Sequence, residues 1–125
     1  MLALHGWLDN CESFHYLAPL LAAAGHHVVA VDMPGHGLSD HLPPGVVYHD
    51  VDNVLMIHRI VTGYGWSRVS LVGHSLGGGV CLLFAACFPH LVEKLVMIDI
   101  THMPQCSGQN HQMCGVIPNS GQEDG

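Results

Sequence analysis

The motif that most constrains this chain is GHSLG at residues 73–77, which lies between two apolar segments. Residues 69–72 have the composition of a short buried strand, and residues from about 76 to 88 have that of an apolar helix. G-x-S-x-G in a turn between a strand and a helix is the pattern of a nucleophile elbow. A serine hydroxyl becomes a useful nucleophile only when it is held exposed, beside a general base and facing an oxyanion site. Ser75 is therefore a candidate nucleophile.

The residues on either side of Ser75 are of the types that a nucleophile elbow requires. A sharp turn from strand to helix brings the two elements close together, and Gly73 and Gly77 carry no Cβ that would collide. At the start of the following helix, the N–H of Leu76 lacks an intrahelical acceptor and faces the place where negative charge would develop. The alternative is a glycine-rich turn with a surface serine. The strand before the motif and the helix after it favour the elbow.

Charge and cysteine usage exclude several classes of protein. Only 3 of the 125 residues are basic and the net charge is −7 with the histidines neutral, so we expect neither nucleic acid nor an anionic membrane as a partner. No apolar run reaches the roughly 18 residues of a membrane span. The 5 cysteines follow no disulfide pattern. This usage is typical of a reducing compartment, so we expect a cytoplasmic protein.

Short apolar runs alternate with helical patterns along the chain. We expect strands at residues 1–4, 28–31, 69–72 and 95–98. We expect helices at residues 17–24, from Asp50 or Asp52 to the stop at residues 63–65, and at residues 76–88. This alternation predicts the α/β class, with a parallel sheet of about four strands and helices on both faces. The run at 28–31 is typical of a strand buried on both faces, and the last helix, apolar nearly all round, of a fully buried helix.

The second of these helices, which residues 63–65 end, has a predicted start and a predicted buried face. Asp50 or Asp52 can cap its first turn. Its apolar positions recur with the period of 3.6 residues that marks a face turned to the core: Val51, Val54, Leu55, Ile57 and Val61.

Three loop motifs follow strands of the predicted sheet. They are His-Gly-Trp at residues 5–7, a run of turn residues at 32–40, and the GHSLG motif. The carboxyl ends of parallel strands lie along one edge of a sheet, and open α/β sheets bind their ligands there. We therefore expect the three motifs to meet at one site.

Residues 101–125 differ in character from the rest of the chain. They show no sustained period and few apolar residues, so we expect a disordered tail, unrelated to the fold, after a domain of residues 1–100. A zinc site is the alternative, but the spacing of its candidate ligands matches no standard pattern. We expect no metal ion and no cofactor. The candidate ligands are His102, Cys106, His111 and Cys114.

In order and spacing, the three motifs resemble those of serine hydrolases with the α/β-hydrolase fold. The sequence of residues 2–10 is similar to that of vertebrate serine hydrolase-like proteins, and the resemblance covers residues 1 to about 100. It implies Ser75 as the nucleophile, the backbone N–H groups of Trp7 and Leu76 as the oxyanion hole, and a structural turn at residues 32–39. It also implies the spatial strand order second, first, third, fourth, and peroxisomes or perinuclear vesicles as the alternative location.

The chain departs from this family pattern on both sides of the motifs. In such enzymes an acid and then a histidine follow the nucleophile after later strands, whereas here one strand follows it. The two strands that usually precede residues 5–7 are absent too. We therefore expect a product truncated at both ends, such as a splice variant or partial gene product.

Histidines of this chain are alternatives for the missing base. We expect His5 and His36 to hydrogen-bond backbone groups and the His74 side chain to point away from Ser75. His102 remains as a residue that could fold back. Asp99 stands where some members of the fold keep their acid, and we expect it to cap the strand end instead.

Two functions remain open. One is a serine hydrolase that acts on an ester or related acyl bond of an unidentified small molecule through Ser75. The other is a catalytically inactive remnant that at most binds a small apolar ligand or a partner. In both cases the open edges of the sheet predict non-specific self-association. A nucleotide-binding module is disfavoured, because the chain lacks G-x-G-x-x-G and a Walker lysine.

Overall fold

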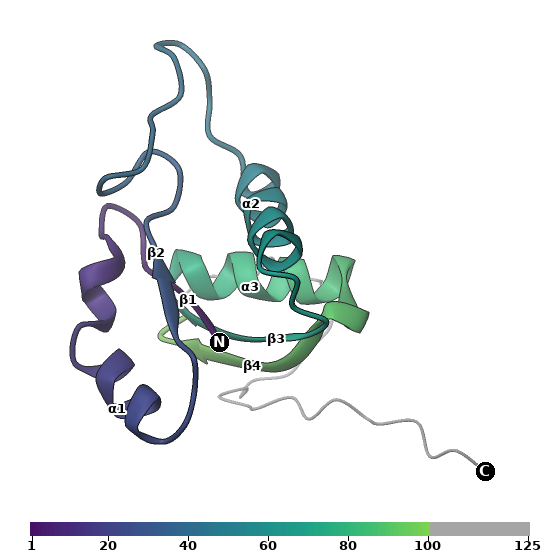
Figure 1. Cartoon of the computed structure of the whole chain (residues 1–125). Helices are drawn as coiled ribbons and strands as arrows, with labels where there is room; N and C mark the ends of the chain where they lie inside the picture. The colour runs from purple at the N-terminus through teal and green to yellow at the C-terminus, as the bar shows by residue number, and fades with distance from the viewer. Residues whose placement is uncertain (101–125) are drawn as a thin grey trace, which may run out of the picture.

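The computed structural model describes residues 1–100 of the chain. Within them the sheet has four strands: β1 (Leu2–Leu4), β2 (Val29–Val31), β3 (Val69–His74) and β4 (Val92–Ile98). The strands lie in the order β2-β1-β3-β4 and each neighbouring pair is parallel (Figure 1). The order and the directions confirm the prediction. The expected tail at 101–125, with the zinc alternative, lies outside the described residues.

Helices cover both faces of the sheet, as the alternation of strands and helices predicts. α2 (Asp50–Gly63) and α3 (Leu76–Cys87) lie on one face. A 3-10 turn, η1 (Cys11–Phe14), and α1 (Leu17–Ala23) lie on the other (Figure 1). A second 3-10 turn, η2 (Pro89–Leu91), leads from α3 into β4.

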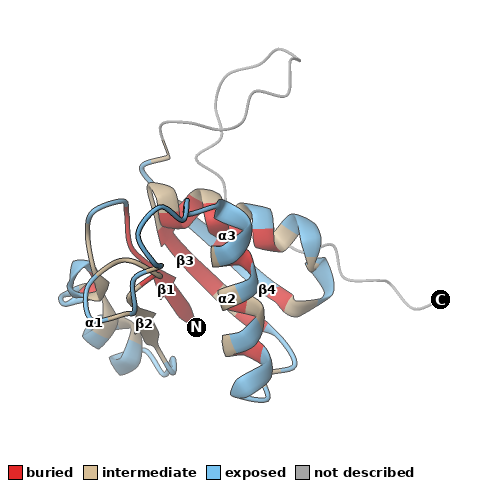
Figure 2. Ribbon diagram, turned by 90° about the horizontal axis from the view of Figure 1, so that it is seen from above, coloured by how far each residue is buried: buried red, intermediate tan, exposed pale blue. Residues whose placement is uncertain are grey.

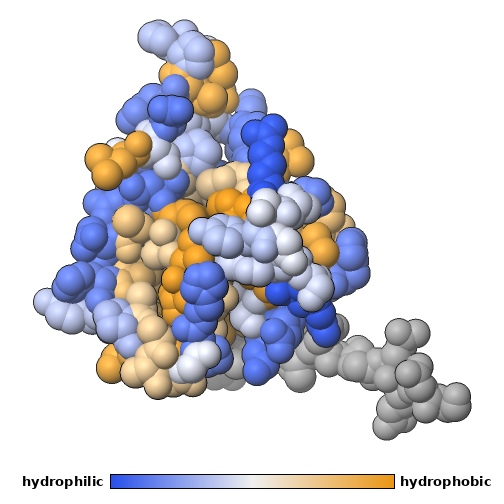
Figure 3. All heavy atoms as spheres, in the orientation of Figure 1, coloured by the Kyte–Doolittle hydropathy of each residue, from blue (hydrophilic) through white to orange (hydrophobic). Residues whose placement is uncertain are grey.

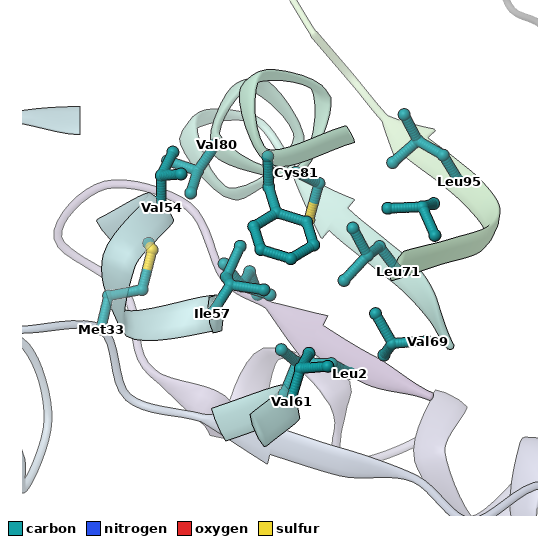
Figure 4. Packing of buried hydrophobic residues seen from close by; sticks show 13 residues of the cluster. Leu2, Met33, Val54, Ile57, Val61, Val69, Leu71, Val80, Cys81 and Leu95 are labelled. Atoms are coloured by element: carbon teal, nitrogen blue, oxygen red, sulfur yellow. The ribbon is translucent and has the colours of Figure 1, made fainter. Parts of the chain in front are cut away.

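Each face of the sheet has its own hydrophobic core. The larger core lies between the sheet and the helices α2 and α3, where Ile57 and Leu71 are completely buried (Figure 4). Phe84 of α3 is completely buried in the same core. Burying one such side chain contributes about 1.5–3 kcal/mol. The smaller core joins Val72 to Phe14 on the opposite face, because successive side chains of a strand point to opposite faces. β1 and β3 form the buried centre of the molecule (Figure 2).

Two elements are less buried than their composition predicted. β2 is only half-buried along its length, because this strand is an edge of the sheet. Val28 lies outside the strand. α3 buries one face, which includes Val80 and Phe84, whereas Leu83 is 38% exposed. The described elements that pack on α3 are the sheet, α2 and η2, and they leave Leu83 on its outer side partly exposed.

The start and the face of α2 also differ from the prediction. The helix is capped at His49 and not at Asp50 or Asp52. Asp52 supports the start from inside the helix, because its carboxylate accepts a hydrogen bond from the His49 N–H at 3.2 Å. The buried stripe consists of Val54, Ile57 and Val61. Val51 and Leu55 lie at the margin of this stripe and are 60% and 45% exposed, since each residue turns the helix by about 100°.

A long loop joins β2 to α2 and projects from the carboxyl edge of the sheet (Figure 1). Val46 and Val47 in it are 50% and 66% exposed, and Figure 3 shows apolar atoms close to its tip. The loop therefore adds apolar surface beside the edge where the motifs meet. Among the helices of residues 1–100, none combines the length and the apolarity that crossing a bilayer requires.

Candidate active site

Ser75 occupies the turn between β3 and α3 in a conformation that serine rarely adopts. Its φ is 50° and its ψ is −117°, and a non-glycine residue held in such a region costs about 1–3 kcal/mol. Two hydrogen bonds hold it there. The Ser75 N–H donates to the Ile98 carbonyl at 2.9 Å, and the Ser75 carbonyl accepts from the Gly79 N–H at 3.1 Å. The turn is thus fixed to the neighbouring strand and to the helix.

The close approach of β3, α3 and the end of β1 leaves no room for side chains at two glycines. A Cβ on Gly73 would lie 2.5 Å from the backbone carbon and oxygen of Gly77. A Cβ on Gly77 would lie 2.5 Å from the carbonyl oxygen of His5 and would also overlap that of Leu4. Such contacts are with backbone, which cannot swing aside, so both positions require glycine.

The turn after β1 lies directly against the elbow. A Cβ on Gly6 would lie 3.5 Å from the Cβ of Ser75, so the backbone of the first motif borders the serine. Trp7 follows Gly6, and Leu76 is the first residue of α3. Within residues 1–100 the N–H groups of Trp7 and Leu76 donate no hydrogen bond. Both N–H groups are therefore without an acceptor in the described part of the chain.

His5 is a structural residue, as predicted. Its side chain is completely buried. Its Nε2 accepts a hydrogen bond from the Met33 N–H at 3.0 Å, which makes Nδ1 the donor to the Gly6 carbonyl at 2.7 Å. With both nitrogens engaged, His5 joins the ends of β1 and β2 and is not available as a base.

Asp32 organises the loop that follows β2. Its carboxylate accepts hydrogen bonds from the N–H groups of Cys11 at 2.7 Å and Leu38 at 2.9 Å, and the Ser39 hydroxyl donates to its carbonyl at 2.6 Å. The bond from Leu38, followed by that from Cys11, holds the pKa of Asp32 below its ordinary value. A Cβ on Gly37, whose φ is 51°, would overlap this carboxylate. These contacts confirm the expected structural turn.

Two further histidines lie near the elbow. His36 places Nδ1 3.1 Å from the Pro34 carbonyl, a backbone contact that confirms the prediction for this residue. Nε2 of His74 lies 4.0 Å from Oδ2 of Asp99. No side chain within residues 1–100 forms a hydrogen bond with the Ser75 hydroxyl, and His102 lies outside the described residues.

Sequence reasoning assigned no role to His74 and missed its pairing with Asp99. A signal was present in the strand pattern. His74 ends β3 on the face of Val72, and it is in register with Ile98 of β4, the residue before Asp99. The pairing follows from this register, which a motif search along one segment does not reveal.

No cluster in the described part of the chain has the composition of a metal site, since no three His, Cys, Asp or Glu side chains there could share an ion. Two surface hollows lie away from the elbow. One of about 280 Å³ is bordered by α3 and β4, and one of about 430 Å³ by α2 and the loop after β2. Ser75 lines neither hollow.

A parallel sheet with a strained serine between its central strand and a glycine-lined helix defines the class of α/β hydrolases. The family model described as "alpha/beta hydrolase fold" matches residues 1–112, and the chain belongs to this family. It is similar to the Drosophila melanogaster "Probable serine hydrolase", with 52% identity over 80% of this chain and 30% of that protein. It is also similar to the human "Serine hydrolase-like protein", with 48% identity over 79% of this chain and 48% of that protein.

Solved structures agree with this assignment. A hypothetical protein from Pseudomonas aeruginosa is 43% identical, with a TM-score of 0.75 over 84% of this chain and 37% of that chain. The thioesterase domain from the curacin biosynthetic pathway is 32% identical, with a TM-score of 0.72 over 77% of this chain and 36% of that chain. The chain spans less than half the length of these relatives.

Proposed function

We propose that this chain carries the nucleophile and the oxyanion site of a serine hydrolase that cleaves an ester or related acyl bond. The observation that carries the proposal is the left-handed backbone of Ser75, with a φ of 50°, beside two N–H groups that no described residue accepts from. Backbone strain of this kind persists only where the surrounding structure maintains it, and it gathers at functional sites. The serine hydrolase-like relatives support the same reaction class.

In the proposed reaction the Ser75 hydroxyl oxygen attacks the carbonyl carbon of the acyl substrate, and a base takes its proton. The carbonyl oxygen becomes an oxyanion, to which the N–H groups of Trp7 and Leu76 donate hydrogen bonds. Collapse of this intermediate expels the alcohol, which receives the proton, and leaves Ser75 acylated. Water then attacks the acyl-enzyme and releases the acid.

We place the general base beyond residue 100, because no described side chain accepts a hydrogen bond from the Ser75 hydroxyl. We place it in a longer protein of the length of the relatives, and His102 is the alternative within this chain. The location is proposed as the cytoplasm, and the free thiols of Cys11, Cys81 and Cys87 support a reducing compartment.

Hydrolysis of p-nitrophenyl butyrate tests the proposal. The full-length Drosophila relative should release p-nitrophenol in a reaction that is lost when its serine equivalent to Ser75 becomes alanine. The 125-residue chain should be slower by orders of magnitude, and Ser75→Ala should abolish what remains. Activity that survives the alanine change in the relative would refute Ser75 as the nucleophile. A saturable binding of the ester without any turnover would favour the inactive remnant.

A further inference from the structure

The imidazole of His74 lies between two backbone segments of the site. On one side, a Cβ built on Gly6 would lie 3.0 Å from His74 Nδ1 and 3.4 Å from Cε1, so the ring rests directly on the Gly6 backbone. On the other side, Nε2 lies 4.0 Å from the Asp99 carboxylate. The His74 side chain is 37% exposed. Because little else surrounds the ring, its contacts with Gly6 and Asp99 are what hold its orientation.

The residues around this ring are adjacent in the chain to the groups of the proposed site. Gly6 immediately precedes Trp7, whose N–H is one oxyanion donor. His74 itself immediately precedes Ser75, and Leu76 follows with the other donor. The distance between the two donors therefore depends on how the turn after β1 seats against the elbow. The His74 ring occupies that contact.

The backbone at Asp99 is anchored beside the ring, although its side chain is 73% exposed. Its φ is 50°, a left-handed conformation that Asp and Asn tolerate better than most residues. The carbonyl of the preceding Ile98 accepts the hydrogen bond from the Ser75 N–H. The carboxylate that faces Nε2 is thus tied through one residue to the elbow itself.

From these contacts we infer that His74 is a positioning residue that sets the turn carrying the Trp7 N–H against the Ser75 elbow. This inference rests on the proposed function. Oxyanion donors act at about 2.7–3.1 Å from the developing charge, and a displacement of about 1 Å can cost 10²-fold in rate. A ring wedged between Gly6 and Asp99 fixes the placement that this geometry requires.

Two measurements on the full chain test the inference. One is the rate at which a fluorophosphonate probe labels Ser75, and the other is the NMR order parameter of the Trp7 amide, which reports motion without any reaction. His74→Ala should slow labelling about 10- to 100-fold and lower the Trp7 order parameter toward about 0.6. His74→Asn, whose side-chain amide can take the place of Nδ1, should restore both. His15→Ala removes another acid-paired histidine, 3.4 Å from Glu12, and should change neither.

A double-mutant cycle gives a sharper criterion. Gly6→Ala alone places a methyl group against the ring and should slow labelling about 10-fold. In the His74→Ala background the methyl group has room, so the same change should have no further effect. Losses that simply multiply would refute the contact as the cause, as would an unchanged Trp7 order parameter in His74→Ala. If neither the wild type nor any variant is labelled, the proposed function fails for this chain. The order parameters of the Trp7 amide still decide whether His74 is a positioning residue.

Discussion

The backbone N–H of Ser75 donates a hydrogen bond to the carbonyl oxygen of Ile98 at a distance of 2.9 Å. This bond joins the proposed nucleophile to the end of β4, the strand that follows it in the chain. The glycines of the motif permit the strained turn, but the neighbouring strand helps to hold it. The elbow therefore depends on the packed sheet as well as on its own five residues.

Alanine at either elbow glycine should destabilise the fold. Gly73→Ala and Gly77→Ala each drive a methyl group into backbone atoms, and overpacking of this kind costs about 1–3 kcal/mol or more. Urea unfolding followed by circular dichroism measures the loss. The matched control is Gly79→Ala, in the same helix as Gly77, where a Cβ meets no atom within 4 Å and a gain of about 0.5–1 kcal/mol is expected. Equal effects at all three positions would contradict the steric account.

Asp32→Asn should destabilise the protein in a pH-dependent way. The folded-state pKa of Asp32 is lowered by the N–H groups of Leu38 and Cys11. Its stabilising effect is therefore complete above the unfolded-state pKa of about 3.9 and disappears as the pH falls through the lower folded-state pKa. At pH 7 we expect a loss of about 1.5–3 kcal/mol, typical of a hydrogen bond to a charged group.

Unfolding curves of the wild type and Asp32→Asn, measured from pH 7 down to pH 2, check this linkage. The two curves should converge at the acid end. A difference that stays constant over the whole range would show that the carboxylate charge does not stabilise the turn. Asp40→Asn removes a carboxylate from the same loop and serves as the control.

The cysteines should differ in reactivity. Burial raises the pKa of the Cys81 thiol to about 12, so almost no thiolate forms at pH 8. Cys87 lies on the exposed side of the same helix. Brief treatment with iodoacetamide, followed by peptide mass spectrometry, should modify Cys87 first and Cys81 only after denaturation. Equal modification in the native protein would place Cys81 at the surface.

Association should follow from the edges of the sheet. Within the described residues β2 and β4 each have an unpaired edge, and on β4 Val96 and Ile98 are 38% and 39% exposed. Light scattering should detect association that grows with protein concentration, and Val96→Lys should reduce it. Leu38→Lys, at a fully exposed loop position, is the control. A monodisperse monomer with a cooperative thermal transition would contradict the prediction.

Periodicity and turn chemistry were sufficient to predict the sheet. Short β-branched runs separated by helical patterns led to four parallel strands, and the resemblance of three motifs led to their order. Burial was harder to predict because it depends on neighbours. Val28 to Val31 reads as a central strand, yet the strand that forms is an edge and is only half-buried. The sequence of α3 is apolar nearly all round, so its pattern does not show which face of the helix packs on the sheet.

The site could be predicted only where one segment carries the information. The GHSLG turn and the Asp32 loop are local, and their residues were found from spacing. The contacts of His74 with Gly6 and Asp99 join three segments at the ends of three strands. Strand register brings them together, and register is set by packing of the whole sheet.

Fluorophosphonate labelling, with the adduct located by mass spectrometry, tests the central claim most directly. In a full-length relative the serine equivalent to Ser75 should label rapidly. In the 125-residue chain the adduct should form slowly and on Ser75, because loss of a triad base leaves only the roughly 10³- to 10⁴-fold catalysis of binding and the oxyanion hole. Rapid stoichiometric labelling of this chain would contradict the proposal that the general base lies outside it. Loss of that reaction in His102→Ala would then identify His102 as the base. An adduct that persists after Ser75→Ala would overturn the assignment of the nucleophile.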